Sequence, residues 1–119
     1  MAQSFDPGDF LVFQLEAGFA MLRVLSVNDD SRDPTWHVAA YSDLFPDIET
    51  AEAATAEPQR LTVSNAHIAL TNRAFESTQV ARIANAALSD DELASFNEWR
   101  SNADRKTWDR SVRLMLGLR

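Results

Sequence analysis

The sequence contains no cysteine, only 3 glycines and no long apolar run. Without cysteine there can be no disulfide framework, no thiol nucleophile and no zinc site with cysteine ligands. The longest apolar runs, such as residues 10–13, fall far short of the roughly 20 residues that a membrane span needs. The N-terminal residues also lack the basic and apolar regions of a signal peptide. We therefore expect a cytoplasmic protein without membrane contact.

Motifs that indicate catalysis are also missing. The sequence has no P-loop, no GxGxxG and no GxSxG, and its glycines are too few for a phosphate-binding loop. The two histidines, His37 and His67, lie in strand-like runs without a neighbouring metal-ligand spacing, so a structural role is favoured for both. A small enzyme would need a pocket that converges on one of them. The sequence favours a non-catalytic protein with no metal and no cofactor.

The charge is acidic and unevenly distributed. The net charge is −7, yet residues 1–99 hold 16 acids against 5 bases, whereas residues 100–119 hold 2 acids against 6 bases. An acidic body repels nucleic-acid phosphates, so nucleic acid is not an expected partner. The basic C-terminal residues fit the exposed face of a helix, because the helix dipole favours cations near its C-terminal end.

Hydrophobic patterns predict four strands in the first part of the chain. A short segment containing Gly18 joins the first two, which is typical of a β-hairpin. The fourth is expected to be irregular near Ser64 and Asn65. The predicted strands cover residues 10–15, 19–27, 35–42 and 60–70.

The second part of the chain predicts helices. Residues 75–84 fit either a fifth strand or a short helix. Ser89 with Glu92 three residues later is a capping-box pattern at the start of a helix. A second helix is expected from Asp104, with one apolar face formed by Trp108, Val112, Met115 and Leu116.

These elements predict an α+β fold of one domain. Hairpin-linked strands favour an antiparallel sheet, and a small sheet must curl or be covered to protect its edges. We therefore expect a small antiparallel SH3-like β-barrel or half-barrel with two C-terminal α-helices. The β-rich part would cover residues 1–86, with an acidic loop at 42–58, and the helical pair would cover residues 87–119.

The segment between the third and fourth predicted strands carries acids and no base, and its alanine-rich stretch between Pro46 and Pro58 fits a short helical turn. From Tyr41 to Glu57 the chain contains 5 acids and no lysine or arginine. Packing onto the barrel is the favoured role for Tyr41 and Phe45, but aromatic residues beside charges also anchor interfaces. In a complex, the acids would set the association rate, Phe45 would anchor and Tyr41 would support the loop. The candidate partner-binding residues are Tyr41, Asp43, Phe45, Asp47, Glu49 and Glu52.

Three short motifs lie along the same part of the chain. The first is Gly-Asp before a strand, followed by a second strand that ends in Arg-Val-Leu. The others are Tyr-x-x-x-Phe with acids and a late Leu-x-x-x-Glu-Leu. The matching residues are Gly8, Asp9, Arg23, Val24, Leu25, Tyr41, Asp43, Leu44, Phe45, Leu88, Glu92 and Leu93. In these motifs, most of residues 7–99 resembles the immunity protein 26 family of bacterial polymorphic-toxin systems.

The resemblance implies a small SH3-like antitoxin of the cytoplasm that binds and blocks a toxin domain. An acidic loop suits this role, because many such toxins act on nucleic acid and carry basic clefts. The first hypothesis is therefore an immunity protein that binds a basic toxin domain through the acidic loop. The alternative is an SH3-like adaptor or regulatory module, which an exposed apolar patch on residues 104–116 would favour.

Overall fold

The computed structural model describes residues 5–28, 34–102, 105–110 and 112. In this part of the chain an antiparallel sheet of five strands is accompanied by three α-helices and one short 3₁₀ helix, which agrees with the expected α+β class. The strands are β1 (Asp9–Leu15), β2 (Gly18–Asn28), β3 (Thr35–Tyr41), β4 (Val63–Thr71) and β5 (Ala81–Asn85). The helices are α1 (Ile48–Ala54), η1 (Pro58–Arg60), α2 (Asn72–Glu76) and α3 (Asp90–Ser101).

The strand order in the sheet is β4-β3-β2-β1-β5. Each of the first three strands is therefore paired with the next one along the chain, and the fifth returns to lie beside the first. The predicted hairpin of β1 and β2 is confirmed, with Leu15 opposite Gly18 at the turn. The predicted irregularity in β4 is also confirmed, because its register against β3 shifts on both sides of Asn65.

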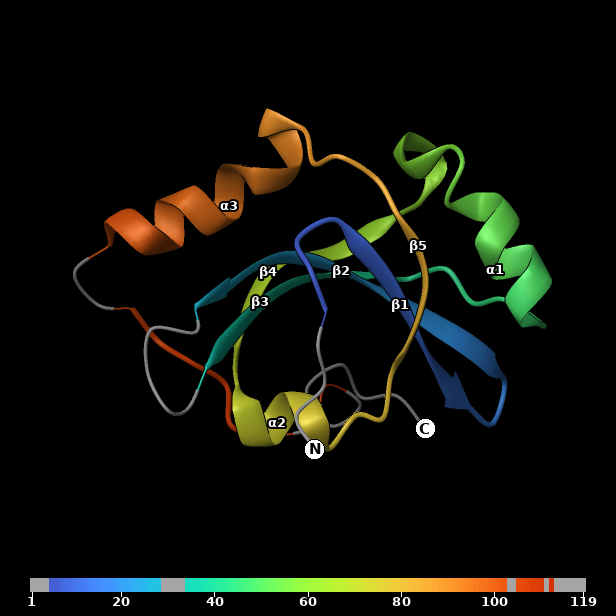
Figure 1. The fold of residues 1–119 in the computed structure, drawn as a ribbon, viewed down its shortest axis with the longest axis horizontal. Helices are drawn as coiled ribbons and strands as arrows, with labels where there is room; N and C mark the ends of the chain where they lie inside the picture. The colour runs from blue at the N-terminus through green and yellow to red at the C-terminus, as the bar shows by residue number, and fades with distance from the viewer. Residues whose placement is uncertain (1–4, 29–33, 103–104, 111, 113–119) are drawn as a thin grey trace.

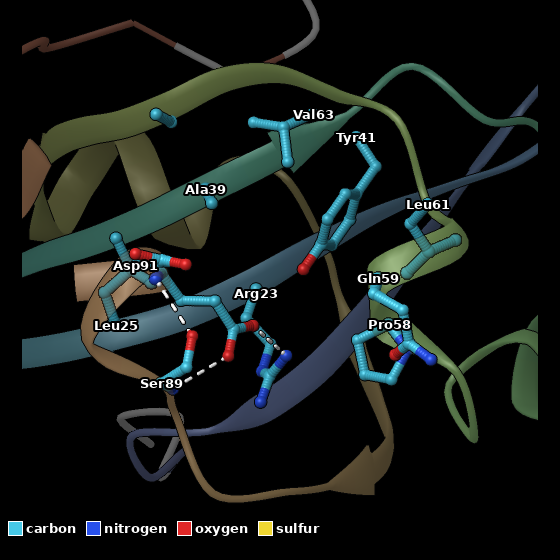
Figure 2. Close-up of a pocket in the computed structure, with 12 residues that line it drawn as sticks. Arg23, Leu25, Ala39, Tyr41, Pro58, Gln59, Leu61, Val63, Ser89 and Asp91 are labelled. Carbon is cyan, nitrogen blue, oxygen red and sulfur yellow. Dashed lines mark hydrogen bonds and ion pairs between the residues drawn. The ribbon is translucent and has the colours of Figure 1, made fainter. Parts of the chain in front are cut away.

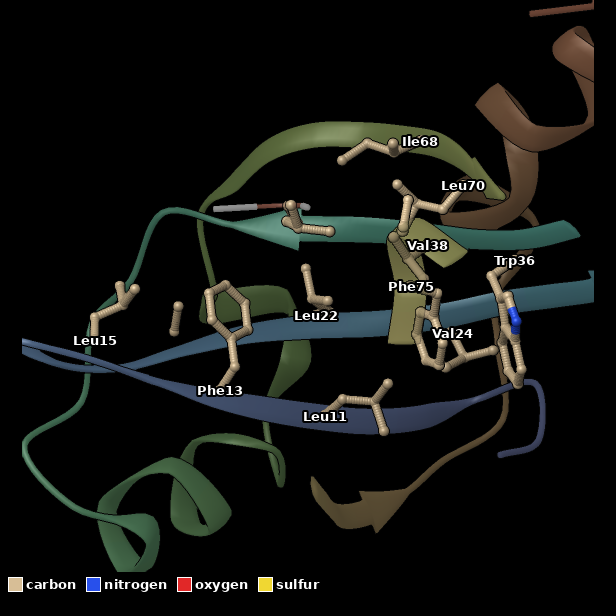
Figure 3. Packing of buried hydrophobic residues seen from close by; sticks show 14 residues of the cluster. Leu11, Phe13, Leu15, Leu22, Val24, Trp36, Val38, Ile68, Leu70 and Phe75 are labelled. Atoms are coloured by element: carbon tan, nitrogen blue, oxygen red, sulfur yellow. The ribbon is translucent and has the colours of Figure 1, made fainter. Parts of the chain in front are cut away.

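The two faces of the sheet are covered by different helices. Figure 1 shows α1 and α3 over one face and α2 on the opposite side. The face toward α2 carries the larger apolar cluster, drawn in Figure 3, in which Phe75 of α2 packs against side chains from β1 to β4. On the opposite face, Ala51 of α1 and Phe96 of α3 each pack in a separate, smaller cluster. We call this opposite face the α1/α3 face.

Residues 75–84, which fitted either a strand or a helix, are divided between both. The short helix α2 ends at Glu76 and the strand β5 begins at Ala81. Thr71 caps α2 by accepting a hydrogen bond from the backbone of Ala74. The spacing of Val80 and Ile83 fits a helix, but residues 81–85 form a strand. Backbone pairing with the edge of β1 outweighs the local helical pattern.

The second C-terminal helix is not observed where it was expected to begin. Residues 105–110 contain no helix, although Val112, the one described residue beyond them, is helical. Trp108 instead bridges to Leu70 at the edge of β4. The Trp108 amide donates to the Ala69 carbonyl at 2.7 Å, and the Thr71 amide donates to the Trp108 carbonyl at 3.0 Å. Unpaired backbone groups at a strand edge explain why this segment is extended. Asp104, Met115 and Leu116 lie outside the described residues.

The apolar residues of this segment are used inside the fold. Val112 is fully buried in the cluster on the α2 side, and the half-buried Trp108 packs against the same cluster. Asp109 accepts hydrogen bonds from Thr71 and Arg73, which lowers the pKa of its carboxyl group.

None of the helices in the described ranges is both long and apolar enough to cross a lipid bilayer.

A histidine pair lies beneath α3. Nδ1 of His37 and Nε2 of His67 are 3.0 Å apart, and the ring centroid of His37 lies 4.6 Å from that of Phe96 and 4.7 Å from that of Trp99. Burial, with a smaller contribution from His67, lowers the pKa of His37 from 6.5 to about 4. Burial also lowers the pKa of His67. Both rings are therefore neutral near pH 7 and act as packing surface for α3, which is the structural role expected for them.

We predict that acidification from about pH 7 to about pH 5 lowers the free energy of unfolding. In the unfolded chain His37 has its ordinary pKa of 6.5, whereas in the folded state its pKa is about 4. Between these values the unfolded state binds more protons, so stability is complete above the unfolded pKa and falls as the pH falls. Over the window from pH 7 to pH 5 the loss corresponds to roughly 2 kcal/mol, at about 1.4 kcal/mol per pKa unit. Urea unfolding at a series of pH values measures the slope.

The matched control is His37→Gln, which keeps a hydrogen-bonding side chain but cannot titrate. This variant should be less stable near pH 7 and should show a much flatter dependence of stability on pH. A slope equal to that of the natural protein would assign the acid sensitivity to other groups.

Candidate partner-binding surface

The middle of the acidic segment is helical, because α1 covers Ile48–Ala54. The carboxylate of Asp47 caps α1 by accepting the backbone N–H of Thr50 at 2.7 Å, and the hydrogen bonds from Thr50 lower the pKa of Asp47. The loop expected at 42–58 is therefore interrupted by α1, where the alanine-rich stretch also fitted a short helical turn, and by the start of η1. Asp47 followed by an alanine-rich run is a sequence signal for a helix start.

The backbone of this segment is fixed against the β1–β2 turn. Phe45 and Phe19 exchange two backbone hydrogen bonds of 2.7 and 2.9 Å. Gly18 has a φ of +146°, and a Cβ at that position would lie 2.5 Å from the carbonyl oxygen of Phe45. Glycine is therefore required for this close approach. Ala51, which is fully buried, holds α1 to the sheet.

The structure gives Phe45 the packing role that the sequence favoured and excludes the alternative of a partner anchor. Its side chain is only 8% exposed and packs with Tyr41, which is 6% exposed, in the cluster beneath α1. A ring buried in this way supports the segment and cannot anchor a partner. Two other apolar side chains are exposed instead, Leu44 at 47% and Ile48 at 40%. Phe45 is buried, as the sequence favoured, whereas the exposure of the adjacent Leu44 was not predicted.

Two of the predicted acids are held by local contacts and two are available. Asp43 accepts the backbone N–H of Thr62 at 2.6 Å, and Asp47 serves as the helix cap. Within the described ranges, the exposed carboxylates of Glu49 and Glu52 have no hydrogen-bond or ion-pair partner. At about 100° of rotation per residue, Ile48, Glu52 and Glu49 follow one another around α1. We call the set Leu44, Asp47, Ile48, Glu49 and Glu52 the acidic surface.

A pocket of about 460 Å³ opens on the α1/α3 face, between η1 and the first turn of α3. Figure 2 shows its lining side chains, with the ring of Tyr41 and the guanidinium of Arg23 at its base. Apolar side chains from β2, β3 and β4 form its walls. Neither His37 nor His67 lines it, so the pocket does not converge on a histidine.

Arg23 is almost completely buried, at 1% exposure, and its guanidinium is saturated with partners. Nη1 donates to the Glu92 carboxylate at 2.7 Å, Nε donates to the Gly8 carbonyl at 3.1 Å, and Nη2 donates to the Ala86 carbonyl at 2.8 Å. The guanidinium carbon also lies 3.9 Å from the centre of the Phe10 ring. This side chain therefore ties β2 to the start of β1, to the connection after β5 and to α3.

Tyr41 and Glu92 complete the surroundings of Arg23. Burial raises the pKa of the Tyr41 phenol, and a hydrogen bond with Arg23 opposes that shift. The side chain of Glu92 also accepts the Ser89 backbone N–H at 2.9 Å, while the Ser89 hydroxyl accepts the Glu92 N–H at 3.1 Å. The predicted capping box is thus confirmed, and it directs Glu92 toward Arg23. The Nε, Nη1 and Nη2 groups of Arg23 all donate to oxygens of the protein, so Arg23 has a structural role and is not a free cation.

We predict that Arg23→Met lowers the free energy of unfolding by about 3 kcal/mol, because it removes the buried ion-pair partner of Glu92 and the donors to the Gly8 and Ala86 carbonyls. Denaturant unfolding monitored by tryptophan fluorescence measures the change. The matched control is Arg60→Met, which breaks the exposed 3.4 Å ion pair with Glu57. That change should cost less than about 1 kcal/mol. Equal losses for the two variants would contradict the role assigned to Arg23.

The described ranges contain no group of three or more histidine, aspartate or glutamate side chains placed to hold a metal ion. Compared with known proteins, the chain is matched by no family model, no curated protein and no solved structure. Its function is therefore inferred from the geometry and charge of the α1/α3 face.

Proposed function

We propose that this protein is a non-catalytic, SH3-like immunity protein that binds and blocks a basic bacterial toxin domain in the cytoplasm. The observation that carries the proposal is the acidic surface. Glu49 and Glu52 are exposed, and exposed apolar side chains lie beside them. Their backbone is fixed to the sheet through Ala51 and the bridge between Phe45 and Phe19. A rigid surface of this kind loses little conformational entropy on binding.

The charge distribution supports a basic partner. The segment from Tyr41 to Glu57 has no positive side chain to balance its acids. Such a surface attracts a basic protein over several ångströms and raises the association rate at low salt. Because many toxins that act on nucleic acid have basic clefts, an inhibitor that presents carboxylates there would occupy the positions of phosphates.

The motifs that resemble the immunity protein 26 family come together in the fold, which also supports the proposal. Gly8 offers its carbonyl to Arg23, Glu92 forms the ion pair with Arg23, and Tyr41 lies beside it. These residues are far apart in the sequence but form one buried contact. A five-stranded sheet whose last strand returns beside the first supports the SH3-like description of the fold.

The acidic surface predicts a salt-dependent loss of association after charge reversal. The variant Glu49→Lys with Glu52→Lys should slow association with a basic toxin domain by about tenfold or more at low salt, and by less at high salt. If the adjacent gene encodes a secreted protein that ends in a basic domain, that domain is the partner to test first, after co-purification with the natural protein. Stopped-flow or surface-plasmon measurements give the rates.

The matched control is Glu76→Lys with Glu98→Lys, which changes the net charge equally from exposed positions on α2 and α3. Its association rate should fall by much less. An unchanged rate in the first variant, or equal losses in both variants, would contradict a specific role for the acidic surface.

The exposed apolar residues predict a different kinetic effect. Leu44→Ala with Ile48→Ala should raise the dissociation rate by about tenfold, because two partly buried contacts are lost, and should leave the association rate nearly unchanged. The same binding experiment separates the two rates. A change confined to the association rate would show that these side chains do not contact the partner.

A further inference from the structure

The pocket between η1 and α3 lies outside the acidic surface and is not used by the function proposed above. We propose that it receives an arginine or lysine side chain of the partner protein. This inference rests on the proposed function, because it takes the partner to be a basic protein. The partner would then contact the α1/α3 face at a second point, through a basic side chain.

The walls of the pocket suit the methylene groups of a long side chain. They are formed by aliphatic residues of β2, β3, β4 and the segment around η1, namely Leu25, Ala39, Pro58, Leu61, Val63 and Ala66. Val63 is 52% exposed at this site, which makes it the most exposed of the large apolar residues described. Long basic side chains bury their apolar stems on such surfaces while the charged end stays near water. At about 460 Å³ the pocket falls within the range of ligand-sized cavities.

The charges around the pocket favour a cation. Its charged lining residues are Arg23, Asp91 and Glu92. The charge of Arg23 is balanced by Glu92 at 2.7 Å, which leaves the exposed carboxylate of Asp91 as the uncompensated charge. A guanidinium or ammonium group at the end of an apolar stem would meet Asp91 at the rim. Gln59 adds an amide oxygen that can accept a hydrogen bond.

An anion would be bound less well here, although α3 begins at the rim. The first turn of α3 already contains Asp90, Asp91 and Glu92, whose charges are favourable next to the helix dipole. The capping box uses Ser89 and the backbone N–H of Glu92. The guanidinium of Arg23 donates to protein oxygens and lies at 1% exposure. An incoming phosphate or carboxylate would therefore face carboxylates without an available basic side chain from the lining residues.

The test uses small probes on the full chain. N-acetyl-arginine methylamide and N-acetyl-lysine methylamide are titrated into isotope-labelled protein, and amide shifts are followed by NMR. We expect shifts at residues around the pocket, above all Tyr41, Leu61 and Val63. The uncharged probe N-acetyl-norleucine methylamide, which keeps the apolar stem, should bind at least about threefold more weakly because it lacks the ion pair.

Two variants in the first turn of α3 give a matched comparison. Asp91→Asn should weaken binding of the arginine probe by about threefold, the size of one partly exposed ion pair. Asp90→Asn carries the same change at a neighbouring position that does not line the pocket, and it should leave the affinity unchanged. The proposal is overturned if no probe shifts these residues, if norleucine binds as well as arginine, or if inorganic phosphate produces the same shifts.

The experiment also separates this inference from the function proposed above. The variant Glu49→Lys with Glu52→Lys should bind the arginine probe as the natural protein does, because neither residue lines the pocket. If this variant lost as much affinity for the arginine probe as Asp91→Asn does, the probe would be attracted by the overall acidic charge. That result would overturn the pocket assignment. Failure of the toxin domain to bind, with probe binding intact, would contradict the immunity role but not the pocket.

Discussion

The buried guanidinium of Arg23 is the interaction on which the α1/α3 face depends. It connects β2 with the start of β1, 15 residues away in the sequence, and with the connection after β5 and α3, 63 and 69 residues away. Buried ion pairs contribute little net stability compared with apolar packing, but they penalise arrangements in which either partner is left alone. Arg23 therefore specifies where α3 lies on the sheet. The pocket exists because α3 and η1 are held apart at that position above Tyr41 and Val63.

Several features of the fold could be predicted from the sequence because they depend on neighbouring residues. The β1–β2 hairpin follows from two apolar runs around Gly18, and the start of α3 follows from Ser89 and Glu92. The features that could not be predicted depend on distant partners. Residues 81–85 form a strand because β1 offers an edge, and Trp108 is extended because the edge of β4 needs donors and acceptors. Local spacing contains no information about either edge.

The candidate surface was predicted in part. The acids of α1 were identified from charge alone, since a run without a base is visible in the sequence. The burial of Phe45, which pairs with Phe19 of β2, agrees with the favoured expectation, but the exposure of Leu44 and Ile48 was not predicted. The pocket had no sequence signal at all, since its lining comes from β2, β3, β4, η1 and α3. The two histidines meet across 30 positions in the chain, which explains why their pairing was also missed.

The bulged edge of the sheet limits how another chain can approach. The C-terminal half of β4 is already paired with the segment around Trp108, while its N-terminal half is distorted by register shifts against β3. Regular strand addition needs a continuous row of free backbone donors and acceptors, which bulges interrupt. The β4 edge is therefore a poor template for recruiting a further strand, whether from a binding partner or from another copy of the chain. Recognition on this side of the molecule has to come from side chains, and the same distortion protects the edge from aggregation.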